Sequence, residues 1–142
     1  ALKAENNKFD FSSSKPLDIL KNIFGHNGFK PQQLEIITRI LNREGSTLGI
    51  MPTGGGKSVC FQIPALIREN LTVVVSPLIA LMKDQIDNLA KKEIYTAFFV
   101  NSSISENTKE KILELVETKK VKLLYVAPES LKSDRILEVL KN

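Results

Sequence analysis

The sequence has no tryptophan, a single cysteine and a single histidine, and it contains no long uninterrupted run of apolar residues. The lone Cys60 excludes an internal disulfide, and no other cysteine or histidine stands near it at zinc-ligand spacing. A membrane-spanning helix needs roughly 20 consecutive apolar residues, and the start of the chain is polar rather than signal-like. We therefore expect an intracellular protein in a reducing compartment, with no membrane partner.

The composition that remains is that of an ordinary folded domain. Of the 142 residues, 42% are hydrophobic and 25% are charged, and both values are close to globular averages. The net charge of +4 permits attraction to nucleic acid, but the lysines are spread along the chain, so charge alone is weak support for such a partner. We expect one domain over residues 16–142, preceded by a flexible, serine-rich lead-in over residues 1–15.

Predicted helices and strands alternate along this domain. Proline at a first helical position predicts helices that begin at Pro16 and Pro31. Further on, short apolar runs each precede an amphipathic segment, which predicts strand–helix pairs. The expected strands are 47–51, 71–76, 95–100 and 121–126, and the expected helices start at Lys57, cover 78–92 and 105–119, and start at about Pro128. Strands separated by helices imply an α/β fold with a mainly parallel sheet flanked by helices.

A glycine-rich segment between the first expected strand and its helix carries the strongest chemical signal. This segment is Thr53-Gly54-Gly55-Gly56-Lys57-Ser58. Its glycines let backbone N–H groups curl around phosphate, and a helix N-terminus favours anions. Lys57 is expected to reach the β- and γ-phosphates as the catalytic lysine, and the Ser58 hydroxyl is expected to hold Mg²⁺. The expected ligand is ATP, or another nucleoside triphosphate, with Mg²⁺.

The segment departs from the strict phosphate-loop pattern, because Met51 stands at the position of its first glycine. A glycine triplet can also be no more than a flexible turn. Here the triplet runs directly into Lys-Ser, follows an expected strand and opens an expected helix. This context favours phosphate binding over a simple turn.

Residues 51–65, MPTGGGKSVCFQIPA, closely resemble the phosphate-loop segment of RecQ-family superfamily 2 helicases, in which a non-glycine first position is usual. Further segments match in the same order, so that the resemblance covers residues 24–131. It implies a P-loop NTPase fold of the RecA type, and the N-terminal portion of the first motor lobe of an ATP-dependent DNA helicase. The intact protein would unwind DNA with 3′–5′ polarity in replication, recombination or repair, in the cytoplasm (nucleoid) or the nucleus depending on its source.

Residues 24–33 resemble the element that recognises adenine in this family. The resemblance gives this task to Gln33, whose amide can donate to N7 of adenine and accept from its exocyclic amine. Lys30 stands where arginine is usual, and His26 stands where some members place an aromatic residue, so stacking on the base is weakened. Both residues belong to the expected ATP site, with the alternative that His26 is only a turn residue.

Three strand-to-loop junctions resemble parts of the family that border the DNA path. They are residues 73–85, similar to motif Ia, residues 101–103, and residues 123–131, similar to motif Ib. Contacts to the phosphate backbone, which carry no sequence information, suit such junctions. The expected contacts to single-stranded or partly duplex DNA are Ser76, Pro77, Asn101, Ser102, Pro128 and Glu129. Without the resemblance, Asn101 and Ser102 can be only a turn and a helix cap.

The sequence also lacks the family's Asp-Glu-x-His segment (Walker B), its coupling motif and its second RecA-like domain with an arginine finger. That arginine alone is worth roughly 10³ to 10⁵ in rate. We therefore expect a truncated chain that binds nucleotide far better than it hydrolyses it, with the rest of the parent helicase as its partner. The alternatives are a DEAD-box-like RNA helicase, which the Phe29-to-Gln33 spacing and the Ser-Pro-Leu-Ile-Ala-Leu segment disfavour, another P-loop NTPase, or a truncated or degenerate nucleotide- or DNA-binding module.

Overall fold

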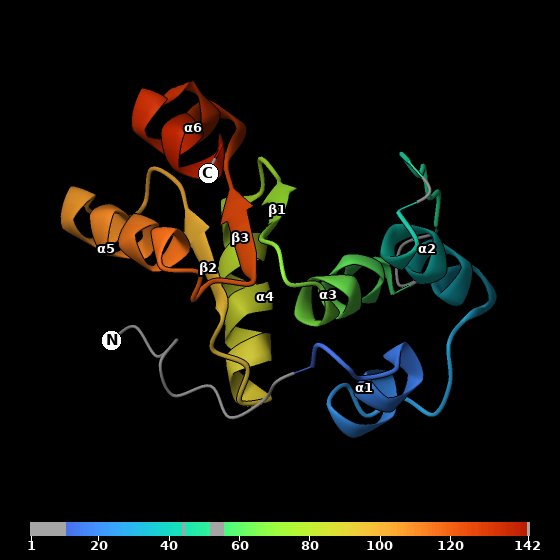
Figure 1. The fold of residues 1–142 in the computed structure, drawn as a ribbon. Coiled ribbons are helices and arrows are strands. Elements are labelled where there is room, and N and C mark those ends of the chain that lie inside the picture. Colours follow the sequence, from blue (N-terminus) through green and yellow to red (C-terminus); the bar gives the residue numbers. More distant parts are fainter. Residues whose placement is uncertain (1–10, 44, 52–55, 142) are drawn as a thin grey trace. The chain divides into compact units, whose positions relative to one another are not determined.

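The computed structural model describes residues 11–43, 45–51 and 56–141. These residues divide into two compact units, which we call the helical unit (within residues 10–70) and the sheet unit (within residues 71–142) (Figure 1). Each unit has its own buried side chains and is described by itself. The single domain over residues 16–142 stays a prediction.

Three helices form the helical unit: α1 (Pro16–Asn22), α2 (Pro31–Leu41) and α3 (Lys57–Ile67). All three begin at the predicted residues, and α1 and α2 start with proline, whose missing N–H costs nothing at a first helical position. Helix α3 packs against both α1 and α2. The fully buried apolar side chains of the unit lie on these three helices and include Ile19, Leu20, Ile37 and Ile63.

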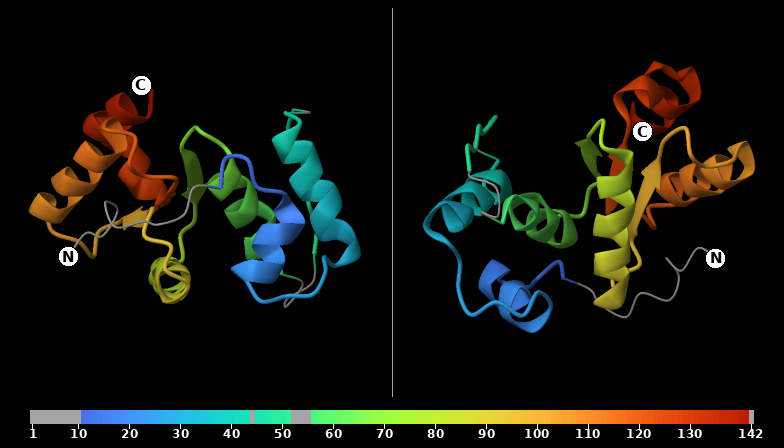
Figure 2. Two further views of the ribbon diagram at one scale, coloured as in Figure 1. Left: turned by 60° about the horizontal axis from the view of Figure 1, so that its bottom comes forward. Right: turned by 180° about the vertical axis from the view of Figure 1, so that it is seen from behind.

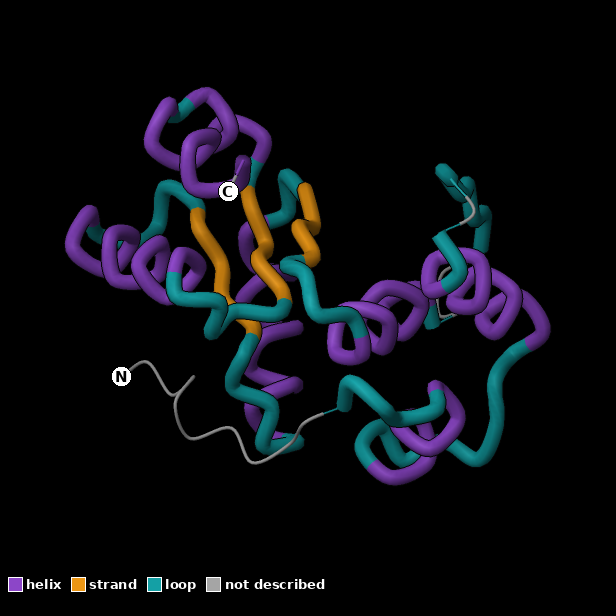
Figure 3. The backbone as a smooth tube through the Cα atoms, in the orientation of Figure 1, coloured by secondary structure: helices purple, strands orange, loops and turns teal. Residues whose placement is uncertain are grey.

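The predicted strand over residues 47–51 is wrong, because residues 46–51 form no regular element (Figure 3). A strand needs a neighbouring strand for its N–H and C=O groups, and no strand of the described chain pairs with this segment. The side chains still alternate: Met51 is buried, and a Cβ on Gly49 would lie 2.7 Å from Ile36 Cδ1, whereas Leu48 and Ile50 are 87% and 80% exposed. The apolar pattern is thus present without the hydrogen bonds that would make it a strand.

A parallel three-stranded sheet forms the centre of the sheet unit. Its strands are β1 (Thr72–Val75), β2 (Ala97–Val100) and β3 (Leu123–Val126), in the order β1-β3-β2. Val126 of β3 pairs in register with both Val75 and Val100, so the three strands end at the same level. The predicted parallel α/β sheet is confirmed, and each strand is shorter than expected by only one or two residues at an end.

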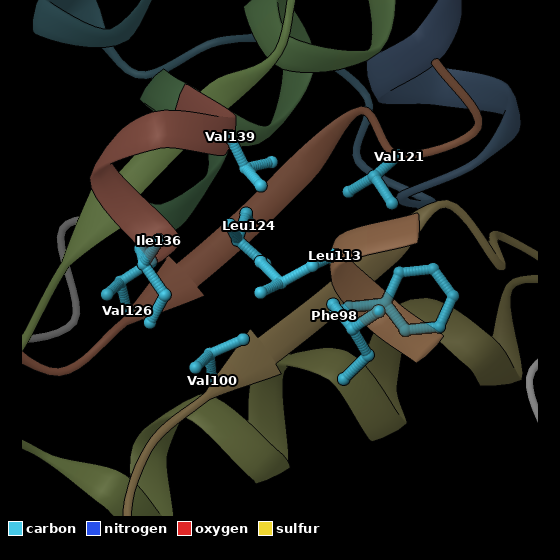
Figure 4. Close-up of a cluster of buried hydrophobic side chains, with 9 residues drawn as sticks. Phe98, Val100, Leu113, Val121, Leu124, Val126, Ile136 and Val139 are labelled. Atoms are coloured by element: carbon cyan, nitrogen blue, oxygen red, sulfur yellow. The ribbon is translucent and has the colours of Figure 1, made fainter. Parts of the chain in front are cut away.

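Helices cover both faces of this sheet: α4 (Ile79–Lys91) lies on one, and α5 (Glu106–Glu117) and α6 (Asp134–Lys141) lie on the other (Figure 2). Successive side chains of a strand point to opposite faces. On β3, Leu124 and Val126 therefore join the core beside α5 and α6, whereas the Tyr125 hydroxyl donates to Gln85 Oε1 on α4. The core comprises Phe98, Val100, Ile112, Leu113, Val121, Leu124, Val126, Ile136 and Val139 (Figure 4).

The last helix does not begin at about Pro128 as predicted. Pro128–Lys132 instead forms the 3₁₀ helix η2, and α6 starts at Asp134. Ser133 has extended backbone geometry between them, and it accepts hydrogen bonds from the backbone N–H groups of Ile136 and Leu137. Serine is a favoured residue immediately before a helix, so a new helix begins after it. No helix in the described ranges is both long enough and apolar enough to cross a membrane.

Candidate nucleotide site

Gly56 is the last glycine of the predicted phosphate-binding triplet, and it opens α3. Its φ of +78° is in the left-handed region, which favours glycine. A Cβ at this position would also lie 2.2 Å from Gln33 Nε2, so the end of the Gln33 side chain would have to shift, and the backbone geometry is the stronger reason for glycine. The other predicted residues of the loop, Thr53, Gly54 and Gly55, lie outside the described residues.

Lys57 and Ser58 form the first turn of α3, with Lys57 exposed and Ser58 half-buried. The first N–H groups of a helix have no partner within the helix, and the residue before α3, Gly56, has no side chain that could cap it. Such an N-terminus attracts anions through its N–H groups and its dipole. The start of α3 therefore combines a helix end of the kind that attracts anions with a lysine and a serine in its first turn.

Gln33 is bonded to the glycine that opens α3. Its side chain is buried, its Oε1 accepts from the Lys30 N–H at 2.8 Å, and its Nε2 donates to the Gly56 carbonyl at 3.1 Å. The first bond caps the N-terminus of α2. The sequence indicates it in part, because glutamine at the third helical position belongs to the capping-box pattern. The second bond joins residues far apart in sequence and had no local signal, so sequence reasoning missed it.

Lys30 and His26, the other predicted base contacts, are both exposed and precede α2. Lys30 immediately precedes α2 and is linked to Gln33 through its own backbone N–H. The His26 backbone N–H donates to the Leu20 carbonyl at 3.2 Å, which ties His26 to the end of α1. The structure thus brings Lys30 beside Gln33 and holds His26 in the turn after α1.

Cys60 is buried on α3, one turn beyond Gly56. Its Sγ lies 3.9 Å from both Met51 Sδ and the Gly56 carbonyl oxygen. Burial raises the pKa of the thiol, and a backbone hydrogen bond opposes this effect only in part. The neutral thiol is therefore favoured, although the thiolate is the reactive form.

We expect the buried Cys60 to react slowly with iodoacetamide. Burial lowers the thiolate fraction and limits access of the reagent, so alkylation near neutral pH should be slower in the folded chain than in urea. The rate in the folded chain should also rise at a higher pH than that of an ordinary cysteine. A time course followed by mass spectrometry measures both effects, and equal rates in the two states would contradict the burial.

A cleft of about 340 Å³ lies beside α2. It is lined by Gln32, Glu35, Ile36, Arg39 and residues 46–50. Neither Gln33 nor Lys57 is among the described residues that line it.

The predicted DNA contacts lie in the sheet unit, soon after the ends of its three strands, which Figure 1 labels. Ser76 follows β1, Asn101 follows β2 and Pro128 begins η2 soon after β3. Because the strands are parallel and end in register, these junctions meet at one edge of the sheet. The topology brings the three junctions together, and their contact with DNA stays a prediction.

The side chains at this edge differ in their burial and in their hydrogen bonds within the protein. Asn101 is buried, with its Oδ1 accepting from the Ser103 N–H at 2.8 Å and its Nδ2 3.6 Å from Met82 Sδ. Ser76 Oγ accepts from the Leu78 N–H at 3.1 Å. The remaining predicted contacts, Pro77, Ser102, Pro128 and Glu129, are exposed. Asn101 therefore shapes its loop from within, and the exposed positions are the ones that solvent or a ligand can reach.

Comparison with known proteins identifies relatives over most of the chain. RecQ of Synechocystis sp., named an ATP-dependent DNA helicase, is 40% identical over 124 residues, which are 87% of this chain and 26% of that protein. RecQ of Bacillus subtilis is 41% identical over 87% of this chain and 21% of its own length. The mouse ATP-dependent DNA helicase Q1 is 40% identical over 92% of this chain and 20% of its own length. The chain thus spans about a fifth to a quarter of these curated relatives.

The characteristic pattern of the DEAD/DEAH box helicase family matches residues 30–142. This range begins just before α2 and includes Gln33, Gly56, Lys57 and Ser58 together with the whole sheet unit. The chain belongs to the DEAD/DEAH box helicase family, and its relatives at about 40% identity are RecQ helicases.

Proposed function

We propose that this chain is the ATP-binding part of the motor of an ATP-dependent DNA helicase. The observation that carries the proposal is the left-handed Gly56 at the start of α3, with Lys57 and Ser58 in the first turn and Gln33 bonded to the Gly56 carbonyl. The names of the relatives support DNA unwinding as the use of this site. The chain spans only part of those relatives, so the activity of a whole helicase is part of what we propose.

In this proposal each residue of the site has a distinct task. The N–H groups of residues 53–56 would surround the phosphates, Lys57 would neutralise the β- and γ-phosphates, and the Ser58 hydroxyl would hold the Mg²⁺ that arrives with ATP. ATP supplies the free energy of phosphoryl transfer when it is bound. A helix end that opens with glycine and an exposed lysine in its first turn fit such a ligand in charge and in donor groups.

Base recognition falls to Gln33 within the same proposal, with Lys30 and His26 beside the base. The amide of glutamine carries two N–H groups and two oxygen lone pairs. The bonds to Gly56 and Lys30 therefore do not by themselves preclude a contact with adenine. Guanine presents an acceptor where adenine has its amino group, so it would not satisfy the same amide.

The proposed DNA contact is the sheet edge at which β1, β2 and β3 end. Ser76, Pro77, Ser102, Pro128 and Glu129 would lie against the sugar-phosphate backbone, and Asn101 would hold its loop in shape. The partner that completes the motor would be a second RecA-like domain. The intact helicase would move with 3′–5′ polarity and work where DNA is kept, in a nucleoid or a nucleus.

The test is a titration of the purified chain with a fluorescent ATP analogue and Mg²⁺, with unlabelled ATP and GTP as competitors. We expect saturable binding, and ATP should displace the analogue at roughly tenfold lower concentration than GTP, since an unsatisfied buried amide costs about 1–3 kcal/mol. Circular dichroism verifies that the chain is folded. Absence of binding by a folded chain would contradict the proposed function, and equal displacement by ATP and GTP would contradict the role of Gln33 in reading the base.

A further inference from the structure

We propose that the end of the sheet at which its strands begin binds the phosphate backbone of single-stranded DNA through five lysines. We call these residues the lysine surface: Lys91, Lys92, Lys119, Lys120 and Lys122. The inference rests on the DNA ligand of the proposed function. The lysine surface lies at the opposite end of the sheet from the strand ends that carry the other proposed DNA contacts, so it gives DNA a second place on the sheet unit.

Two helix-to-strand turns form the lysine surface. One is residues 91–96, at the end of α4 and before β2, and the other is residues 118–122, between α5 and β3. The Lys122 N–H donates to the Thr96 carbonyl at 2.8 Å, and the Lys122 carbonyl accepts from the Thr72 N–H at 2.9 Å. The two turns therefore lie side by side where the strands of the sheet begin (Figure 1).

These two turns are strongly positive. They contain five lysines and one acidic residue, Glu93, so the net charge of the two turns is +4. Glu117, just before the second turn, is bonded to Arg135 at 2.8 Å and is neutralised there. The exposed lysines of the surface are Lys91, Lys119 and Lys120. Lysine meets phosphate as a point charge, so such a surface suits a sugar-phosphate backbone of any sequence.

The fold itself does not explain the lysines of the second turn. The second residue after each helix C-cap is Ile94 in one turn and Lys120 in the other, and its N–H donates back to the helix. This motif favours glycine at the preceding position and an apolar residue here. Ile94 is buried, as the motif favours, but Lys120 is exposed. Lys119, like Glu93 in the first turn, has a φ of +61°, which strains a side chain. Binding of an anion is a reason to keep lysine at both positions of the second turn.

DNA bound at the lysine surface can be measured separately from DNA bound at the strand ends. Each strand has four residues and is thus about 13 Å long. Charges in water are screened over about 8 Å at physiological salt. Removing lysines where the strands begin therefore changes the electrostatic potential at the strand ends only slightly. A loss of DNA affinity in such a variant reports on the lysine surface.

The experiment follows the anisotropy of a fluorescein-labelled oligothymidine titrated with the purified chain at about 50 to 200 mM salt. The test variant combines Lys119→Gln with Lys120→Gln. The control combines Lys15→Gln with Lys21→Gln, which removes the same charge from two exposed positions of the helical unit. We expect the test variant to bind about tenfold more weakly than the control at the lowest salt, and its salt slope to be smaller by about 1.4, which is about 0.7 for each phosphate contact. The control should stay within about twofold of the wild type.

A second pair of variants separates DNA binding from stability. Lys119→Gly places the preferred residue at a positive φ, so the thermal unfolding midpoint should not fall, while the salt slope should become smaller by about 0.7. Glu93→Gly makes the same backbone change in the first turn but removes a negative charge. It should therefore bind DNA at least as tightly as the wild type. Opposite effects on DNA affinity from two equally folded glycine variants cannot come from damage to the fold.

Two results would overturn the inference, and they differ in what else they affect. If the folded lysine variants bind oligothymidine as the control does, the lysine surface does not bind DNA, and the proposed contacts at the strand ends stand. If the folded wild-type chain does not bind oligothymidine even at the lowest salt, both DNA surfaces are wrong. The titration with the ATP analogue tests the nucleotide site independently of either result.

Discussion

Replacing Lys57 with alanine is expected to lower the affinity of the chain for MgATP by at least about tenfold. A hydrogen bond from a charged group contributes about 1.5–3 kcal/mol, which corresponds to roughly 10- to 100-fold in a dissociation constant. Lys57 is exposed in the first turn of α3, so its truncation removes no core packing. Titration with the fluorescent ATP analogue measures the affinity, and thermal unfolding followed by circular dichroism verifies the fold.

Lys21→Ala provides the matched control for this substitution. Lys21 is an exposed lysine in the last turn of α1, within the same helical unit, and it has no role in the proposed site. Its replacement removes the same positive charge from the chain and should leave MgATP affinity within about twofold. Unchanged affinity in a folded Lys57→Ala chain, or equal losses in the two variants, would contradict the phosphate-binding role of Lys57.

Replacing Leu124 with alanine is expected to destabilise the sheet unit by about 2.7–5 kcal/mol. Leu124 is fully buried on the central strand β3, in the core between the sheet and α5 and α6 (Figure 4). The variant loses both the burial of its side chain and the contacts around the cavity that remains. Since a domain of this kind is stable by only about 5–15 kcal/mol, a large share of its stability disappears. Urea denaturation followed by circular dichroism measures the shift of the midpoint.

Leu78→Ala is the corresponding control in the same unit, because Leu78 is 58% exposed and lies outside the core cluster. The same number of atoms is removed, but few of them are buried, so the expected change is below about 1 kcal/mol. Equal destabilisation by the two variants would mean that β3 is not the centre of the core of the sheet unit.

The sequence predicted the fold of the sheet unit well because its signals there are local. The apolar runs of β1, β2 and β3 and the amphipathic patterns of α4 and α5 each specify an element through its own residues. The segment from Thr47 to Met51 carries an equally clear apolar pattern, but a strand also depends on a partner, which no local pattern reports. The start of α6 was missed because Ser133, which follows η2 and accepts from the Ile136 N–H, divides into two helices a segment that was predicted as one.

The residue types of the candidate site could be predicted from the sequence, but the hydrogen bond that joins its two helices could not. Gly56, Lys57 and Ser58 were identified from residue types and spacing, and the left-handed backbone of Gly56 agrees with the need for glycine. The bond between Gln33 and Gly56 joins two elements distant in sequence, and only the packing of α2 on α3 creates it. For Asn101 the residue type alone was misleading. It suggests a contact with a ligand, whereas the side chain is buried and accepts a hydrogen bond from the Ser103 N–H in its own loop.

Leu48 and Ile50 are almost entirely exposed to solvent beside α2. Association of the chain through these two side chains should therefore depend on temperature. Covering a side chain of this kind is favourable by about 1.5–3 kcal/mol, and the gain comes from the release of ordered water. Such a driving force weakens on cooling. Any apolar surface that meets these two side chains is therefore held more tightly in a warm solution than in a cold one, and low temperature favours separate, fully hydrated molecules.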